Sequence, residues 1–173
     1  MRAGLVILAV LALGAQPALA QTKTKAAPTG EAIAALEMCE AFALGGDTLV
    51  DDAIADGWDA YEQDPESPFV RSYAASKELP GIGWGDLFAL VETYPGRVFG
   101  YCRIDFMEPK GDGKAMIDAL AGLERFEGDV VEQDGGHYAS LSGGDTLLLT
   151  HWDDVGFVIQ LTTLTPVATP AED

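Results

Sequence analysis

The second half of the chain contains short stretches in which apolar and polar residues alternate. In the last of these stretches, Phe157, Ile159 and Leu161 take every second position. A period of two is typical of a strand that buries one face. Gly and Asp separate these stretches, which predicts antiparallel pairing through short turns. The expected strands cover residues 87–94, 97–107, 129–133, 137–141, 146–152 and 157–164.

The first half of the chain favours helices. Apolar residues recur every three positions between residues 29 and 44, where Thr29 can cap the helix start, and Gly45-Gly46 follows. This pattern predicts a helix over 29–44 that ends at the glycine pair. A shorter helix is expected from residue 47 or 48 to about residue 57, and a third over residues 112–125.

Residues 57–85 have no clear period and are rich in Pro, Gly and aromatic residues. A structureless loop of that length is uncommon in a compact domain. We therefore expect some structure near residues 69–77, and the sequence leaves open a helix or an edge strand there.

This order of elements predicts a single α+β domain over residues 29–166. The expected architecture is one antiparallel sheet of about five to six strands, made of a hairpin and a C-terminal meander. Two or three helices would pack on one face of that sheet. Residues 167–173 are expected to form a mobile tail, because Pro166 and Pro170 end regular structure.

Two cysteines, Cys39 and Cys102, are predicted to form one disulfide. Cys39 lies near the apolar stripe of the first helix, and Cys102 lies on the apolar side of an alternating strand. Both sulfurs would therefore point into the core. The two cysteines would also share an oxidising compartment if the protein is exported, and an even number of cysteines favours pairing there.

The first twenty residues are expected to be a signal peptide. Arg2 precedes an apolar run, and the triplet Ala18-Leu19-Ala20 places small residues where a signal peptidase needs them. The run is about half the roughly 20 residues that span a membrane. Cleavage is expected between Ala20 and Gln21, with residues 21–28 as a short flexible tether. The mature protein would then be periplasmic or extracellular.

The chain is strongly acidic, with 10 Lys and Arg against 28 Asp and Glu and a formal net charge of −18. Such a surface repels nucleic acid and anionic lipid, and it attracts cations and basic proteins. Between Ala26 and Val70 there is no Lys or Arg, although this stretch holds eleven carboxylates. Charge of one sign also serves solubility, so the stretch is either a binding surface or a solvated face.

A partner-binding surface is predicted within and beside this acidic stretch. If the second helix extends by a turn, three of its Asp residues fall on one side. Aromatic residues nearby could anchor a partner, or they could instead fix a long loop onto the core. The candidate binding residues are Asp52, Asp56, Asp59, Glu62, Trp58 and Trp84.

The sequence contains no convincing catalytic motif. It has no nucleophile elbow, phosphate-binding loop or EF-hand spacing, and we expect neither a cofactor nor a metal. The two imidazoles, His137 and His151, fall in neighbouring expected strands and could share a metal or catalytic site with carboxylates.

Three functions remain open. The favoured one is an exported, non-enzymatic binding module that meets a protein partner, for which a basic protein is the natural choice, as an inhibitor or accessory of an envelope enzyme. The second is an envelope hydrolase or metal-dependent enzyme that uses His137 and His151. The third is a structural accessory protein without a ligand.

Overall fold

The computed structural model describes residues 27–65 and 67–167. The expected signal peptide and its cleavage site lie outside these residues, as do most of the tether and of the C-terminal tail. No helix in the described part is long and apolar enough to cross a membrane.

Eight strands form one antiparallel sheet in the order β1-β2-β3-β4-β8-β7-β6-β5. The α+β class and the single antiparallel sheet are confirmed, whereas the expected number of five to six strands was too low. The strands are β1 (Asp59–Glu62), β2 (Val70–Leu79), β3 (Gly83–Tyr94), β4 (Arg97–Met107), β5 (Glu127–Gln133), β6 (Gly136–Gly143), β7 (Thr146–Trp152) and β8 (Gly156–Pro166).

The two additional strands come from the segment that the sequence left irregular. β1 and β2 pair with each other, and β2 pairs with β3 along its whole length, from Val70 opposite Glu92 to Leu79 opposite Gly83. The buried side of β2 carries Tyr73, Ala75 and Leu79. A small residue in the middle of this set weakens the apolar alternation, which explains why the sequence pattern did not distinguish a strand from a helix here.

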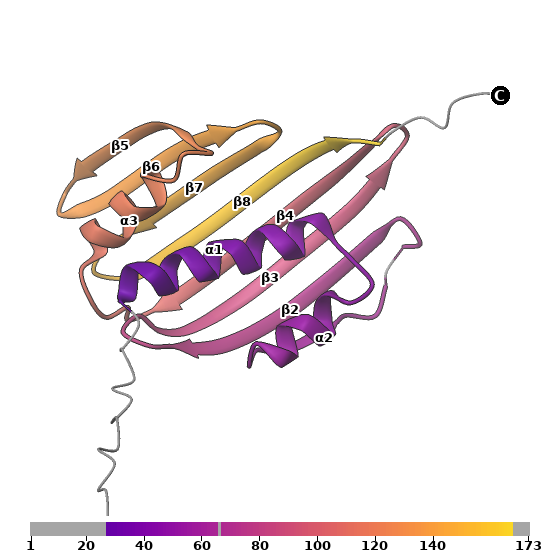
Figure 1. The fold of residues 1–173 in the computed structure, drawn as a ribbon, viewed down its shortest axis with the longest axis horizontal. Helices are drawn as coiled ribbons and strands as arrows, with labels where there is room; N and C mark the ends of the chain where they lie inside the picture. The colour runs from indigo at the N-terminus through magenta and orange to yellow at the C-terminus, as the bar shows by residue number, and fades with distance from the viewer. Residues whose placement is uncertain (1–26, 66, 168–173) are drawn as a thin grey trace, which may run out of the picture.

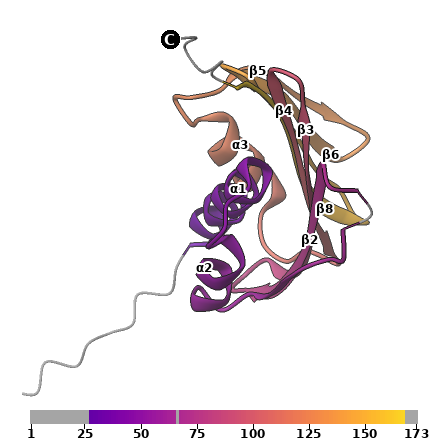
Figure 2. The ribbon, with the colours of Figure 1, turned by 90° about the vertical axis from the view of Figure 1, so that its right-hand side faces the viewer.

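Three helices pack against one face of the sheet, as expected: α1 (Pro28–Leu44), α2 (Leu49–Ala55) and α3 (Gly113–Ala121). They leave the other face uncovered (Figure 1 and Figure 2). α1 begins at Pro28 without a side-chain cap, so the cap expected from Thr29 is absent. Proline suits the first helical position because its missing N–H would have no partner there.

The helix α1 is fastened to the centre of the sheet. Cys39 of α1 and Cys102 of β4 form the predicted disulfide, with their Cα atoms 5.4 Å apart. Both cysteines are fully buried, and the core around them is formed by large side chains such as Phe42, Ile104 and Phe106. The disulfide therefore links the helix layer to the sheet within the hydrophobic core.

Two buried polar side-chain atoms have no hydrogen-bond partner among the described residues, the hydroxyl of Tyr73 and the indole nitrogen of Trp152. The side chain of Tyr73 is fully buried against Phe42, with ring centroids 5.5 Å apart, and its hydroxyl makes no hydrogen bond. An unsatisfied buried hydroxyl costs stability, because it loses its hydrogen bonds to water.

The substitution Tyr73→Phe is therefore expected to raise the free energy of unfolding by about 1 kcal/mol. Burial raises the pKa of Tyr73 above its ordinary value of 10.0. Above pH 10 the unfolded chain loses this proton while the folded chain keeps it. The free energy of unfolding of the wild type therefore falls as the pH rises, and the difference in favour of the variant increases. Urea unfolding at pH 7 and at pH 10.5 measures both effects. The exposed Tyr61→Phe is the control, and a loss of stability in Tyr73→Phe at pH 7 would contradict the argument.

Candidate functional site

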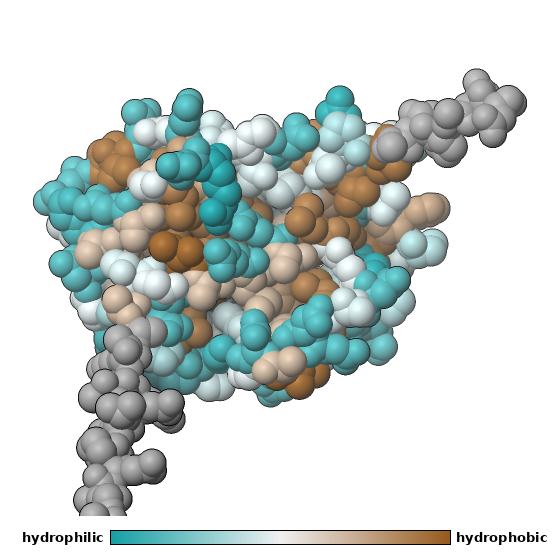
Figure 3. All heavy atoms as spheres, viewed as in Figure 1, coloured by the Kyte–Doolittle hydropathy of each residue, from teal (hydrophilic) through white to brown (hydrophobic). Residues whose placement is uncertain are grey.

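A groove runs between α1 and α2 on the helix-bearing side of the molecule. It has a volume of about 310 Å³. The wider surface on this side shows hydrophobic residues interrupted by hydrophilic ones (Figure 3). The groove is lined from α1 by Ala34, Glu37, Met38 and Ala41, and from α2 by Leu49, Asp52 and Ala53, with Asp56 at the end of that helix.

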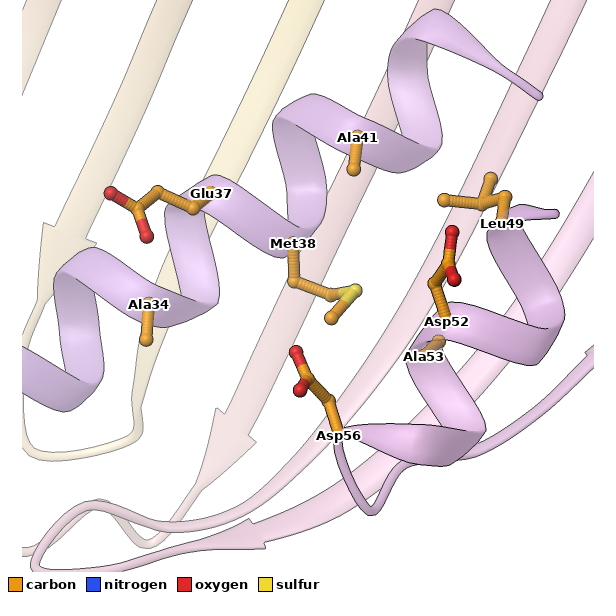
Figure 4. Close-up of a pocket in the computed structure, with 8 residues that line it drawn as sticks. All are labelled: Ala34, Glu37, Met38, Ala41, Leu49, Asp52, Ala53 and Asp56. Carbon is orange, nitrogen blue, oxygen red and sulfur yellow. The ribbon is translucent and has the colours of Figure 1, made fainter.

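The groove combines an apolar floor with carboxylates. Met38 of α1 points into the space between the helices, and Asp52 and Asp56 extend toward it from the α2 side (Figure 4). These two Asp residues share one side of α2 because residues four apart lie on the same side of a helix. Asp52 accepts a hydrogen bond from the hydroxyl of Thr48 at 2.9 Å. No Lys or Arg of the described part of the chain lines the groove.

Two nearby carboxylates outside the groove are neutralised by arginine. Glu62 accepts two hydrogen bonds from the Arg71 guanidinium, at 2.8 and 2.9 Å, and Glu40 accepts two from Arg125, at 3.0 and 3.1 Å. The hydrogen bonds from Arg71 lower the pKa of Glu62 below its ordinary value of 4.5. Within residues 27–65 and 67–167, none of the three groove carboxylates takes part in an ion pair. Among the described residues, Lys77 is a cation close to them, and its ammonium donates a hydrogen bond to the backbone carbonyl of Asp56 at 2.5 Å instead of to a carboxylate.

Two of the six candidate binding residues, Asp59 and Trp84, lie on the opposite, helix-free face of the sheet. α2 ends before Asp56, and Gly57, with a φ of 86°, reverses the chain into β1. Asp59 then pairs with Ser76 and does not join Asp52 and Asp56. The indole of Trp84 is half exposed and donates a hydrogen bond to Asp86 at 3.0 Å.

Trp58 is a core residue. Only 5% of it is exposed, and the ammonium group of Lys77 lies 5.7 Å from the centre of its ring. This burial agrees with the alternative that the aromatics of the segment fix the chain onto the core. Among the predicted binding residues, the groove therefore brings together only Asp52 and Asp56.

The structure does not bring the two histidines together. His137 pairs with Trp152, whereas His151 pairs with Tyr138. Adjacent residues of a strand point to opposite faces, so the two imidazoles lie on opposite sides of the sheet. His151 stacks on Tyr138 with ring centroids 5.8 Å apart. No group of three His, Cys, Asp or Glu able to hold a metal occurs among the described residues.

The helix-free face of the sheet is a second surface, which the sequence analysis did not single out. Phe88 and Tyr101 lie side by side on it, with ring centroids 6.5 Å apart, beside the ion pair of Arg103 with Asp105 at 2.6 Å. The sequence did contain a signal for this surface, because apolar residues occupy outward positions of the expected strands. The exposed apolar residues of this face are Tyr61, Trp84, Phe88, Tyr94, Met107, Val131, Tyr138, Leu147, Leu149 and Leu164.

Comparison with known proteins gave no match: no family model, curated protein or solved structure is significantly similar to this chain.

Proposed function

We propose that the protein is a non-enzymatic binding module whose groove between α1 and α2 takes a basic, partly apolar segment of a protein partner. The observation that supports this proposal is an apolar floor bordered by the carboxylates of Glu37, Asp52 and Asp56, which form no ion pair with any described residue. An apolar side chain of the partner would cover Met38, and flanking Lys or Arg side chains would reach the carboxylates.

The lining of the groove suits a polypeptide segment. Ala34, Ala41 and Ala53 leave room for side chains to enter, and the flexible thioether of Met38 adapts to different shapes. Charge complementarity speeds encounter and discriminates between partners. The net charge of −18 would direct a cationic protein toward the surface from a distance.

The proposal includes export and the kind of partner. The expected signal peptide and the disulfide support a place in the periplasm or outside the cell, where disulfides persist. A cationic enzyme of the envelope is the natural partner, which the module would inhibit or assist.

Reversal of the groove charge is expected to weaken binding of a basic amphipathic helical peptide, with Leu on one side and Lys on the other, by about tenfold or more. The double variant Asp52→Lys with Asp56→Lys replaces attraction by repulsion at two carboxylates that line the groove. Fluorescence anisotropy of the labelled peptide, at low and at moderate salt, measures the change.

The matched control is Asp51→Lys with Asp154→Lys. It changes the net charge by the same amount at two exposed positions that do not line the groove. If both double variants weaken binding equally, the attraction comes from the overall charge and the groove is not the site. If the unaltered protein does not bind the peptide at either salt concentration, the proposed function itself fails.

A further inference from the structure

The strand β5 forms one free edge of the sheet. Within residues 27–65 and 67–167 it pairs only with β6, and all seven of its residues are exposed. Figure 1 shows it as the outermost strand of the sheet, beyond β6. Val130 and Val131, at 45% and 52% exposure, point to opposite sides of the strand. A strand added beside β5 would thus find an apolar contact on each face of the sheet.

The opposite edge of the sheet is built differently. β1 has four residues, and α2 packs against it. Proteins commonly protect their edges with short strands or by covering them, because an open strand is a template for another chain. β5 is longer, all of its residues stay exposed although α3 contacts it, and its register with β6 is continuous from Glu127 to Gln133. Its one protective feature is charge.

The turn after β5 determines which backbone groups are free. β5 and β6 join through Asp134 and Gly135, which have φ angles of 53° and 82°. In a two-residue turn of this kind the flanking residues, Gln133 and Gly136, form a hydrogen-bonded pair. Hydrogen-bonded and non-hydrogen-bonded pairs alternate along the strands. The N–H and C=O groups of Glu132 and Val130 are therefore directed away from β6.

The charge of the edge selects the incoming strand. β5 carries Glu127 and Asp129 toward the helix-free face and Glu132 toward the other, and it has no Lys or Arg. Among the described residues, His137 lies near Glu132, with its Nδ1 atom 4.0 Å away, and the ammonium of Lys114 also interacts electrostatically with Glu132. Opposite charges across a strand pair stabilise it, and like charges destabilise it. A second β5 would bring three more carboxylates to the same seam.

We propose that the β5 edge accepts an extended basic segment of a protein partner as a ninth strand of the sheet. Main-chain hydrogen bonds to Val130 and Glu132 would hold the segment, and Lys or Arg at the positions opposite the three carboxylates of β5 would meet them. This surface lies at the end of the sheet away from α2, and its function is independent of the groove.

The probe is the labelled peptide Thr-Lys-Val-Val-Lys-Thr-Lys. In antiparallel register about Val130, its lysines oppose Glu132, Asp129 and Glu127, and its valines oppose Val131 and Val130. We expect saturable binding to the disulfide-bonded protein at low ionic strength. Methylation of the second, fourth and sixth peptide nitrogens, which would face β5, should weaken binding about tenfold or more. Methylation of the third and fifth nitrogens, which would face solvent, should leave it unchanged.

On the protein side, Val130→Pro removes one outward N–H, and proline is tolerated in an edge strand where that group faces solvent. Val130→Thr keeps the N–H and the branched shape. We expect Val130→Pro to weaken binding about tenfold or more and Val130→Thr to retain it, with circular dichroism confirming both folds. Asp52→Lys with Asp56→Lys should leave binding of this peptide unchanged, which separates this edge from the groove.

Two results would overturn the proposal. Equal binding of the two methylated peptides would mean that charge alone attracts the probe. A doubling of the mass in solution that Val130→Pro abolishes would assign the edge to a second copy of this chain instead of a basic segment.

Discussion

Replacing Gly100 by alanine is expected to lower the free energy of unfolding by about 3 kcal/mol. Gly100 lies in β4 beneath the end of α1, where a Cβ atom would overlap the backbone oxygen of Ala43 and lie 2.5 Å from the hydroxyl oxygen of Thr163. A backbone oxygen cannot rotate away as a side chain can. The whole end of α1 would have to lift from the sheet. Urea unfolding of the purified variant measures the loss.

The control is Gly30→Ala, the same chemical change within α1. A Cβ atom at Gly30 meets nothing within 4 Å, so only the helix propensity changes. Alanine is better than glycine in a helix by about 1 kcal/mol, and this variant should be slightly more stable than the wild type. A Gly100→Ala variant as stable as the wild type would show that α1 does not lie so close to β4.

Removal of the disulfide is expected to cost roughly 4 kcal/mol of stability. The bond joins cysteines 63 residues apart, and this long loop restricts the unfolded chain strongly. The double variant Cys39→Ala with Cys102→Ala, or the wild type in a reducing agent, should unfold at a clearly lower urea concentration. Far-ultraviolet circular dichroism at low urea tests that the variant still folds.

Alkylation of the cysteines tests the disulfide independently. Alkylation of the unfolded, unreduced protein should leave its mass unchanged, whereas alkylation after reduction should modify both cysteines. Two modified cysteines without reduction would contradict the disulfide. A loss of stability below about 1 kcal/mol in the double variant would mean that the unfolded chain is already compact near these residues.

The sequence predicted best those elements whose apolar period is carried by large residues. The helix over residues 29–44 matches α1, Pro28–Leu44, within one residue, and the strand over 97–107 matches β4, Arg97–Met107. Cys39 belongs to the first of these patterns and Cys102 to the second. For this reason their disulfide could also be predicted.

The strands β1 and β2 could not be predicted because their environment determines them. β2 carries small residues such as Ala74 and Ala75, and its ladder with β3 supplies the stability that its own sequence lacks. The helix expected to continue to residue 125 ends at Ala121 instead, with Gly122 at its end. Glycine stabilises helices poorly, and the chain turns there to bury Phe126.

The candidate site was predictable only in part, for a geometric reason. Asp52 and Asp56 share a side through the helical period, which the sequence reveals. Their proximity to Met38 depends on how α1 and α2 pack, and no local pattern encodes that packing. The separation of His137 from His151 likewise follows from the register of β6 with β7, in which a shift by one residue would exchange faces.

The central place of β8 has a consequence for how the chain folds. β4 and β8 form the middle of the sheet, although their paired residues lie roughly fifty to seventy positions apart in the sequence. β1 to β4 and β5 to β8 can each form from hairpins between strands that are consecutive in the sequence. The two halves of the sheet join through β4 and β8, so they can pair only after β8 has been synthesised. Such distant pairing slows folding and leaves β4 open in the meantime. A chain emerging from a ribosome or a membrane pore would therefore complete its sheet only after β8 has appeared.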